Sequence, residues 1–188
     1  MDLSKHLMDV FGTLSKDEKL LRLLYYKATD KFDDVLIKSD KRPNIIGNGS
    51  LINSGEYDDK AMTTNGIIND TIRLSKVVDD LTDDDPRCRV TTYLDALDIV
   101  TSANGIINKV LLNVNFTVDI YAHSDFEKID FRLSKLVSRV YDLLYYKRIT
   151  GMGEFMLTSS IPIDSKEELN GGYVGYRLGF KFSIGAPT

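Results

Sequence analysis

Two segments of the chain alternate strictly between apolar and polar residues, and this period constrains the fold more than any other feature. Residues 110–122 place seven apolar side chains, from Val110 to Ala122, on one face and Asn, Thr, Asp and Tyr on the other. Residues 174–184 repeat the pattern, with Gly, Arg, Lys and Ser on the polar face. A period of two is typical of a β-strand with one buried face. The sequence therefore predicts two long strands in a sheet that is covered on one side.

The segment between these two strands has the spacing of an amphipathic helix. Apolar side chains recur at helical spacing from Ile129 to Leu144, and charged residues occupy the other face. Ser124 and Glu127 have the spacing of a capping box, in which two side chains satisfy free amide groups at the start of a helix. The pattern predicts one long helix that begins near Ser124 and ends before the Thr150–Gly153 turn.

Two further strands complete the predicted sheet. One covers Arg87–Leu94, and the other runs from the Thr150–Gly153 turn to about Ile161. Strands and helices are not regularly alternated, so the predicted class is α+β, with a mixed or antiparallel four-stranded sheet and the long helix on one face. The predicted core consists of Phe116, Val118, Ile120, Leu133, Val137, Val140, Leu144, Leu178, Phe180 and Phe182.

The first 86 residues are predicted to form an extension of helices and loops, and residues 87–188 are predicted to form the α+β core. We expect both parts to fold as one cooperative domain. A first short helix ends at Gly12, and a Ser15–Glu18 capping box opens a second. Residues 28–62 are rich in Asp, Asn, Ser and Gly and predict mostly loop. A third helix is predicted over Ile67–Val78, followed by an acidic turn that ends at Pro86.

Composition narrows the function classes. The 188 residues carry 24 Lys and Arg against 28 Asp and Glu, a net charge of −4, which disfavours general binding to nucleic acid. No apolar run approaches the roughly 20 residues of a membrane helix. The single cysteine, Cys88, lies in a predicted strand and is expected to be a buried apolar residue in a reducing compartment.

The sequence contains no recognisable catalytic motif. His6 and His123 have no nucleophile or carboxylate at a recognisable spacing, and no cofactor or metal motif is present. An enzyme assembled from scattered carboxylates such as Asp119, Asp125 and Asp130 remains an alternative. So does an α+β module that binds a small ligand beside the sheet. The residues favour a binding or assembly module over an enzyme.

The second half of the chain is similar to a known class. The segments 115–123, 130–134, 149–153 and 172–180 follow one another in an order that resembles the neck and tail-completion proteins of tailed bacteriophages, in particular tail terminators and tail-to-head joining proteins. Leu20–Lys27 also looks like the opening of such proteins. The resemblance covers roughly residues 87–184 and, more loosely, the first 30.

This resemblance implies a structural virion protein and no catalytic residues. Such proteins form a ring, commonly a hexamer, that stops growth of the tail tube and joins the tail to the head. The implied partners are further copies of the chain, the tail tube protein and a head-side connector, and DNA passes through the lumen without specific binding. The implied location is the virion neck, assembled in the host cytoplasm, with no membrane. Another neck protein, for head completion or adaptation, is the alternative within this class.

Three features are candidates for the contacts of such an assembly. The Asp95–Lys109 link is too long for a plain hairpin and carries four β-branched apolar residues. Two tyrosine pairs in helical segments are candidate aromatic anchors. The final strand carries two glycines that allow close backbone approach at an open sheet edge. The predicted contact residues are Tyr25, Tyr26, Ile99, Val100, Ile106, Ile107, Tyr145, Tyr146, Gly175 and Gly179.

Overall fold

The fold is given by a computed structural model that describes residues 3–53, 61–76, 81, 86–100, 111–149, 151, 153–163 and 172–185. The helices are α1 (Leu3–Ser15), α2 (Glu18–Tyr25), α3 (Thr64–Thr71), α4 (Ser124–Asp130) and α5 (Arg132–Leu144). The strands are β1 (Ile72–Arg73), β2 (Cys88–Val100), β3 (Leu111–His123), β4 (Met156–Ile163) and β5 (Tyr173–Gly185).

The predicted α+β class is confirmed, but the mixed sheet has five strands in the order β1-β2-β3-β5-β4. The additional strand, β1, lies inside the predicted third helix. That helix ends at Thr71 because Ile72 and Arg73 pair in parallel with Val90 and Thr91 of β2. The other neighbouring strands are antiparallel.

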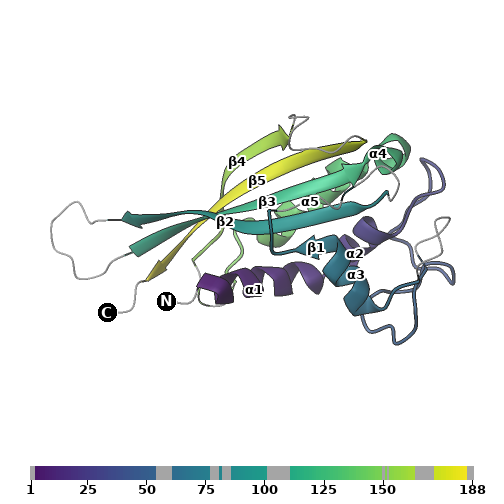
Figure 1. Cartoon of the computed structure of the whole chain (residues 1–188), viewed down its shortest axis with the longest axis horizontal. Coiled ribbons are helices and arrows are strands. Elements are labelled where there is room, and N and C mark those ends of the chain that lie inside the picture. The colour runs from purple at the N-terminus through teal and green to yellow at the C-terminus, as the bar shows by residue number, and fades with distance from the viewer. Residues whose placement is uncertain are drawn as a thin grey trace.

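One face of the sheet carries the main core. Helices α1, α2 and α5 pack against this face, with α1 beside β1 and β2, and α5 across β3 and β5 (Figure 1). The predicted core residues of β3 and β5 are buried, as are Val140 and Leu144 of α5. Leu133 and Val137 are only partly buried, and Leu136 takes the innermost position instead.

The buried positions of α5 differ from the prediction because the predicted long helix consists of two helices, α4 and α5. Phe131 separates α4 from α5 in the left-handed conformation, with φ 54°. The carboxylate of Glu127 then accepts from the amide of Leu133 at 2.7 Å, so it serves the start of α5 rather than a capping box with Ser124. His123 is the N-cap of α4 through its Nδ1 atom.

The first two helices also differ from the prediction at their junction. Helix α1 passes through Gly12 and ends at Ser15. The N-cap of α2 is Asp17, which accepts from the amide of Leu20 at 2.7 Å. Glu18 instead reaches the loop after α2, where it accepts from two backbone amides. A tertiary contact therefore replaces the predicted capping box.

The second face of the sheet holds a smaller buried cluster. Leu81, Tyr121, Ile163 and Tyr173 form an apolar group there. Beside it, Asp119 is fully buried and accepts two hydrogen bonds from Arg177, at 2.7 and 2.8 Å. The polar face of β3 is thus partly covered, although its alternation predicts solvent on that side.

Strand β2 is longer than predicted. Pairing with β3 continues past a bulge between Leu94 and Ala96 as far as Val100 opposite Leu111. The first six residues of the predicted 95–109 link therefore belong to the sheet. Beyond the helices, β2, β3 and β5 extend together as an arm, at the left in Figure 1.

Candidate assembly surfaces

The first tyrosine pair holds a loop in place. Tyr26 is fully buried and donates to the carbonyl of Pro43 at 2.7 Å, and burial raises the pKa of its phenol to about 12. Tyr25 is partly buried and donates to the carbonyl of Ile52 at 2.6 Å. Both side chains fasten the loop between α2 and α3, and Tyr26 offers no surface to a partner.

The second pair lies after α5. Tyr145 is partly buried and stacks on Tyr141, with ring centroids 4.5 Å apart. Tyr146 is 54 % exposed and left-handed, with φ 55°. Its amide donates to the carbonyl of Phe155 at 2.9 Å, which joins this turn to the segment that leads into β4. Tyr146 is therefore the accessible member of the predicted aromatic anchors.

The prediction that the final strand is an open edge is wrong, because β5 pairs with β3 on one side and β4 on the other. Gly175 and Gly179 are both buried within the sheet. A Cβ atom at Gly179 would lie 2.2 Å from Oγ of Ser159, beside the bulge in β4. This glycine makes room for a neighbouring strand of the same chain.

The remaining predicted contacts lie on or beyond the arm. Ile99 and Val100 are the last residues of β2, opposite Leu112 and Leu111 of β3. Ile106 and Ile107 lie outside the described residues. The backbone of the first pair is thus fixed by strand pairing.

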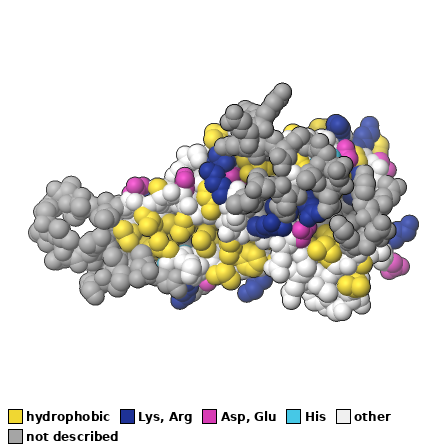
Figure 2. Space-filling view, viewed as in Figure 1, with side chains coloured by type: hydrophobic (Ala, Val, Ile, Leu, Met, Phe, Trp, Pro, Cys, Tyr) yellow, Lys and Arg dark blue, Asp and Glu magenta, His cyan; other side chains and the backbone are white. Residues whose placement is uncertain are grey.

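The structure has two lateral surfaces at opposite edges of the sheet. The first, here called the β2 side, consists of α1, β1 and the outer edge of β2. Within the described residues, β1 covers only Val90 and Thr91, so the outer half of β2 has no neighbouring strand on that edge. Figure 2 shows hydrophobic side chains gathered along the arm and continuing toward α1. Large exposed members of this side are Met8 (53 % exposed) and Leu97 (49 %).

The second lateral surface, here called the β4 side, consists of β4 and residues 145–148. Among the described strands, β4 pairs with β5 alone, so its outer edge is open as well. Its exposed apolar side chains are Tyr146, Met156 (42 %) and Ile161 (49 %). Pro162 removes one backbone donor from this strand, a common feature of sheet edges in soluble proteins.

A third surface lies at the end of α2, and buried arginines organise it. Arg22 is 2 % exposed and donates to the carbonyls of Val35, Ile37 and Pro43 at 2.7–2.9 Å. The same guanidinium donates to the carbonyl of Arg42 at 3.2 Å, so it holds four carbonyls of the following loop. Residues 26–53 of this loop are held in this way although they contain neither a helix nor a named strand.

Arg132 connects the same end of α2 to the α4–α5 junction. It is fully buried, pairs with buried Asp130 at 3.0 Å, and donates to the carbonyl of Tyr26 at 2.7 Å. A second bond reaches the carbonyl of Leu23. Phe131, between the two paired residues, is left-handed and 71 % exposed. The ion pair therefore holds a phenylalanine toward solvent in a costly backbone conformation.

Arg42 stabilises the turn that carries a second exposed phenylalanine, Phe32. It donates to Asp33 at 2.5 and 2.7 Å and to the carbonyl of Lys27 at 3.0 Å. These hydrogen bonds hold the pKa of the Asp33 carboxyl well below its usual range. Asp30 closes the turn by accepting from the amide of Phe32, whose side chain is 85 % exposed. The α2 end, defined by Phe32, Phe131 and the three arginines, thus displays two exposed aromatic side chains on a backbone that hydrogen bonds hold in place.

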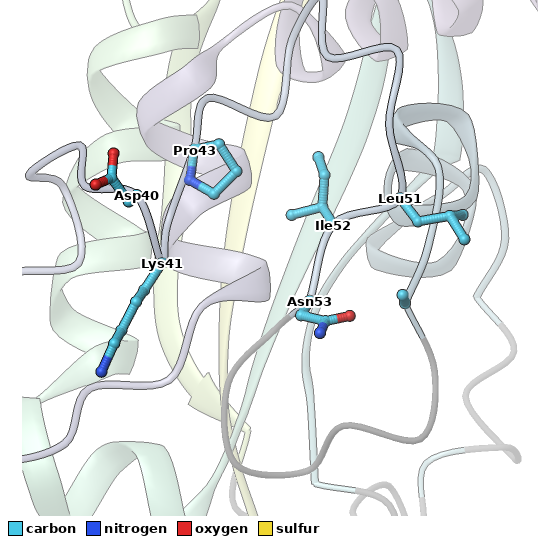
Figure 3. Close-up of a pocket in the computed structure, with 7 residues that line it drawn as sticks. Asp40, Lys41, Pro43, Leu51, Ile52 and Asn53 are labelled. Atoms are coloured by element: carbon cyan, nitrogen blue, oxygen red, sulfur yellow. The ribbon is translucent and has the colours of Figure 1, made fainter.

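A cavity of about 510 Å³ lies in the loop between α2 and α3. Figure 3 shows the Asp40–Pro43 segment facing the Leu51–Asn53 segment across it, and Ala61 completes the lining. The described lining residues combine a carboxylate, an amine and an amide with apolar side chains. Such a cavity can hold an apolar side chain or a small molecule.

Groups suited to metal or covalent chemistry are sparse. No cluster of three or more potential metal ligands occurs among the described residues. In the same part of the chain, no helix is long and apolar enough to cross a membrane. Cys88 is buried, and burial raises the pKa of its thiol to about 12, so it is a poor nucleophile at neutral pH.

The sequence patterns did not point to the residues that form the α2 end. Asp130, Phe131 and Arg132 fall within a segment that carries the phage resemblance, but their pairing depends on carbonyls more than 100 residues away. Nothing in the local sequence marks Arg22 as buried or Phe32 as exposed. The alternation predicts that the strand ends at Leu94, because the bulge between Leu94 and Ala96 interrupts it, and Leu97 then falls in the predicted link.

Comparison with known proteins agrees with the phage class. The profile of the YomW family matches residues 17–182, which include the α2 end, the β4 side and the β2 strand. In Bacillus subtilis (strain 168), the "SPbeta prophage-derived uncharacterized protein YomW" is 33 % identical over 175 residues, which cover 92 % of each chain. The chain therefore belongs to the YomW family and is a phage-derived protein.

Proposed function

We propose that this chain is a structural protein of the phage particle, which forms a ring at the head-side end of the tail tube. In this role it stops growth of the tube and joins tail to head, within the neck of a virion assembled in the host cytoplasm. The proposal includes no catalytic or membrane function. The observation that carries it is the pair of open surfaces, the β2 side and the β4 side, which different residues form at opposite edges of one sheet.

Two different surfaces on one chain are what a ring requires. In a ring each subunit sets one surface against a different surface of its neighbour, and the chain of contacts closes by rotation. Stable contacts exclude about 800 Å² per partner from water, and exposed apolar side chains on both sides contribute to that area. The resemblance to tail terminators suggests six copies.

The α2 end provides a separate surface for another protein of the neck. It lies at the end of the sheet away from the arm, so a ring built through the lateral sides leaves it free (Figure 1). Its two exposed phenylalanines have the character of interface anchors, and their rigid support reduces the entropy lost on binding. The tail tube protein and the head-side connector are the partners that we propose for the two ends of the ring.

The net charge of −4 is compatible with a channel for DNA. An acidic wall repels phosphate groups, whereas a basic wall would hold the genome by releasing its counterions. We therefore propose that DNA passes through the lumen without specific binding.

A stop codon in the reading frame, in a phage that encodes this chain, tests the proposal. We expect infectious particles to fall by several orders of magnitude, and electron microscopy of the lysate to show filled heads separated from tails of irregular length. Supplying the intact chain from a plasmid should restore joined particles. Normal numbers of joined particles without the chain would refute the proposal.

The same experiment separates the two alternatives. Tails of uniform length beside unjoined heads would favour a head-completion or adaptor protein. The cavity near Pro43 is the observation that favours a small-ligand module, and normal particle assembly together with a ligand-induced rise in melting temperature would support that function.

A further inference from the structure

The turn after α5 displays an aromatic side chain at an energetic cost. Tyr146 is one of two non-glycine residues with positive φ among the described residues, and bulky side chains disfavour that conformation. Hydrogen bonds hold it there, because the amide of Tyr146 donates to Phe155 and that of Lys147 donates to Leu144. A strained and exposed tyrosine is typical of a binding contact.

The exposed charges that follow Tyr146 are basic, and the exposed charges in the outer half of β2 are acidic. Lys147 follows Tyr146 and is exposed, and Arg148, paired with Glu154, is 77 % exposed. In the outer half of β2, Asp95 and Asp98 are exposed, and Asp98 lies on the face of the strand opposite to Leu97, where it accepts a hydrogen bond from Nδ2 of Asn115 at 2.9 Å. The turn at Tyr146 and the outer half of β2 each combine an exposed apolar side chain with charges, and the charges are of opposite sign.

From this complementarity, we infer that the β2 side of one copy binds the β4 side of a second copy, with Tyr146 against Leu97 and Lys147 beside Asp95. The inference rests on the proposed ring and identifies its subunit contact. Because the two sides lie at opposite edges of the sheet, the contact leaves one side of each copy free for the next neighbour. A contact of this kind propagates from copy to copy instead of ending at a two-fold dimer, and it forms a ring when the rotation between neighbours closes.

Introduced cysteines test this contact, because the buried Cys88 thiol does not compete for a maleimide. The full chain carrying both Leu97→Cys and Tyr146→Cys would be treated with a short bismaleimide linker in assembled particles. We expect a ladder of covalent multimers that ends at the full ring. Each single variant should give no ladder, and a mixture of the two single variants should give covalent dimers and nothing larger.

A matched control uses Ile37→Cys, which is 65 % exposed but lies on the loop after α2. Paired with Leu97→Cys, it should give no ladder. Covalent dimers from Leu97→Cys or Tyr146→Cys alone would show a two-fold contact and overturn the inference. A ring visible in the particles without any Leu97–Tyr146 product would overturn the contact and leave the proposed function standing, whereas absence of the ring would remove both.

Charge exchange provides a second readout that needs no cysteine. Lys147→Glu should reduce the yield of joined particles at least tenfold, and adding Asp95→Lys should restore most of it. Both residues are exposed, so neither change removes packing from the core. If Lys147→Glu alone gives as many joined particles as the wild-type chain, Lys147 does not take part in the proposed contact.

Discussion

Replacing Arg132 with methionine is expected to lower the free energy of unfolding by roughly 3–5 kcal/mol, because the buried carboxylate of Asp130 loses its buried partner and keeps only the partly exposed Lys135, at 3.3 Å. Asp130 is 2 % exposed, and Arg132 is fully buried. The substitution also removes donors to the carbonyls of Leu23 and Tyr26. In a protein of this length, such a loss corresponds to a fall in melting temperature of roughly 6–20 °C.

The matched control is Arg148→Met, which removes an ion pair with Glu154 at 2.9 Å whose side chains are 77 % and 42 % exposed. Exposed pairs contribute about 0–1 kcal/mol, so its urea midpoint should stay close to that of the wild type. Combining Arg132→Met with Asp130→Leu should recover part of the lost stability, since no unpaired charge remains buried. If Arg132→Met unfolds at the same urea concentration as Arg148→Met, the buried pair does not support the α2 end.

The second large effect is expected at the other face of the sheet. Arg177→Met should lower the free energy of unfolding by roughly 3 kcal/mol, because Asp119 stays fully buried and loses both bonds from the guanidinium. The hydroxyl of Tyr93 still donates to Asp119 at 3.0 Å, which keeps the loss at the lower end of the range for broken buried pairs. Thermal unfolding followed by circular dichroism measures the difference.

Lys181→Met is the control for this change, since Lys181 lies on the same face of β5 and is partly exposed. Its melting temperature should lie within about 2 °C of the wild type, as expected for a surface substitution worth less than about 0.5 kcal/mol. Equal melting temperatures for Arg177→Met and Lys181→Met would show that the Asp119 pair contributes little.

Long, strictly periodic segments allowed much of the sheet to be predicted. The apolar faces of β3 and β5 identify the core from Phe116 to Phe182, because a period of two leaves one way to bury these side chains. The amphipathic stripe before Leu144 likewise identifies α5. These predictions depend on local pattern alone, and the structure confirms them.

Predictions failed where a distant contact decides the local structure. Glu18 leaves the expected capping box because two loop amides bind it, and Phe131 breaks a helix because Arg132 is drawn toward α2. The edge strands could not be assigned because strand order is a property of the whole sheet. Tyr26 illustrates the same point, since its burial under the loop near Pro43 depends on residues outside its own helix.

The location and copy number of the chain in the intact particle test the central proposal most directly. A reconstruction of the phage neck by electron cryomicroscopy should show the chain as a closed ring of about six copies around the tail axis, at the head-side end of the tube. The β2 side of each copy should face the β4 side of the next. A neck that lacks the chain, or holds one copy away from the axis, would contradict the proposed function.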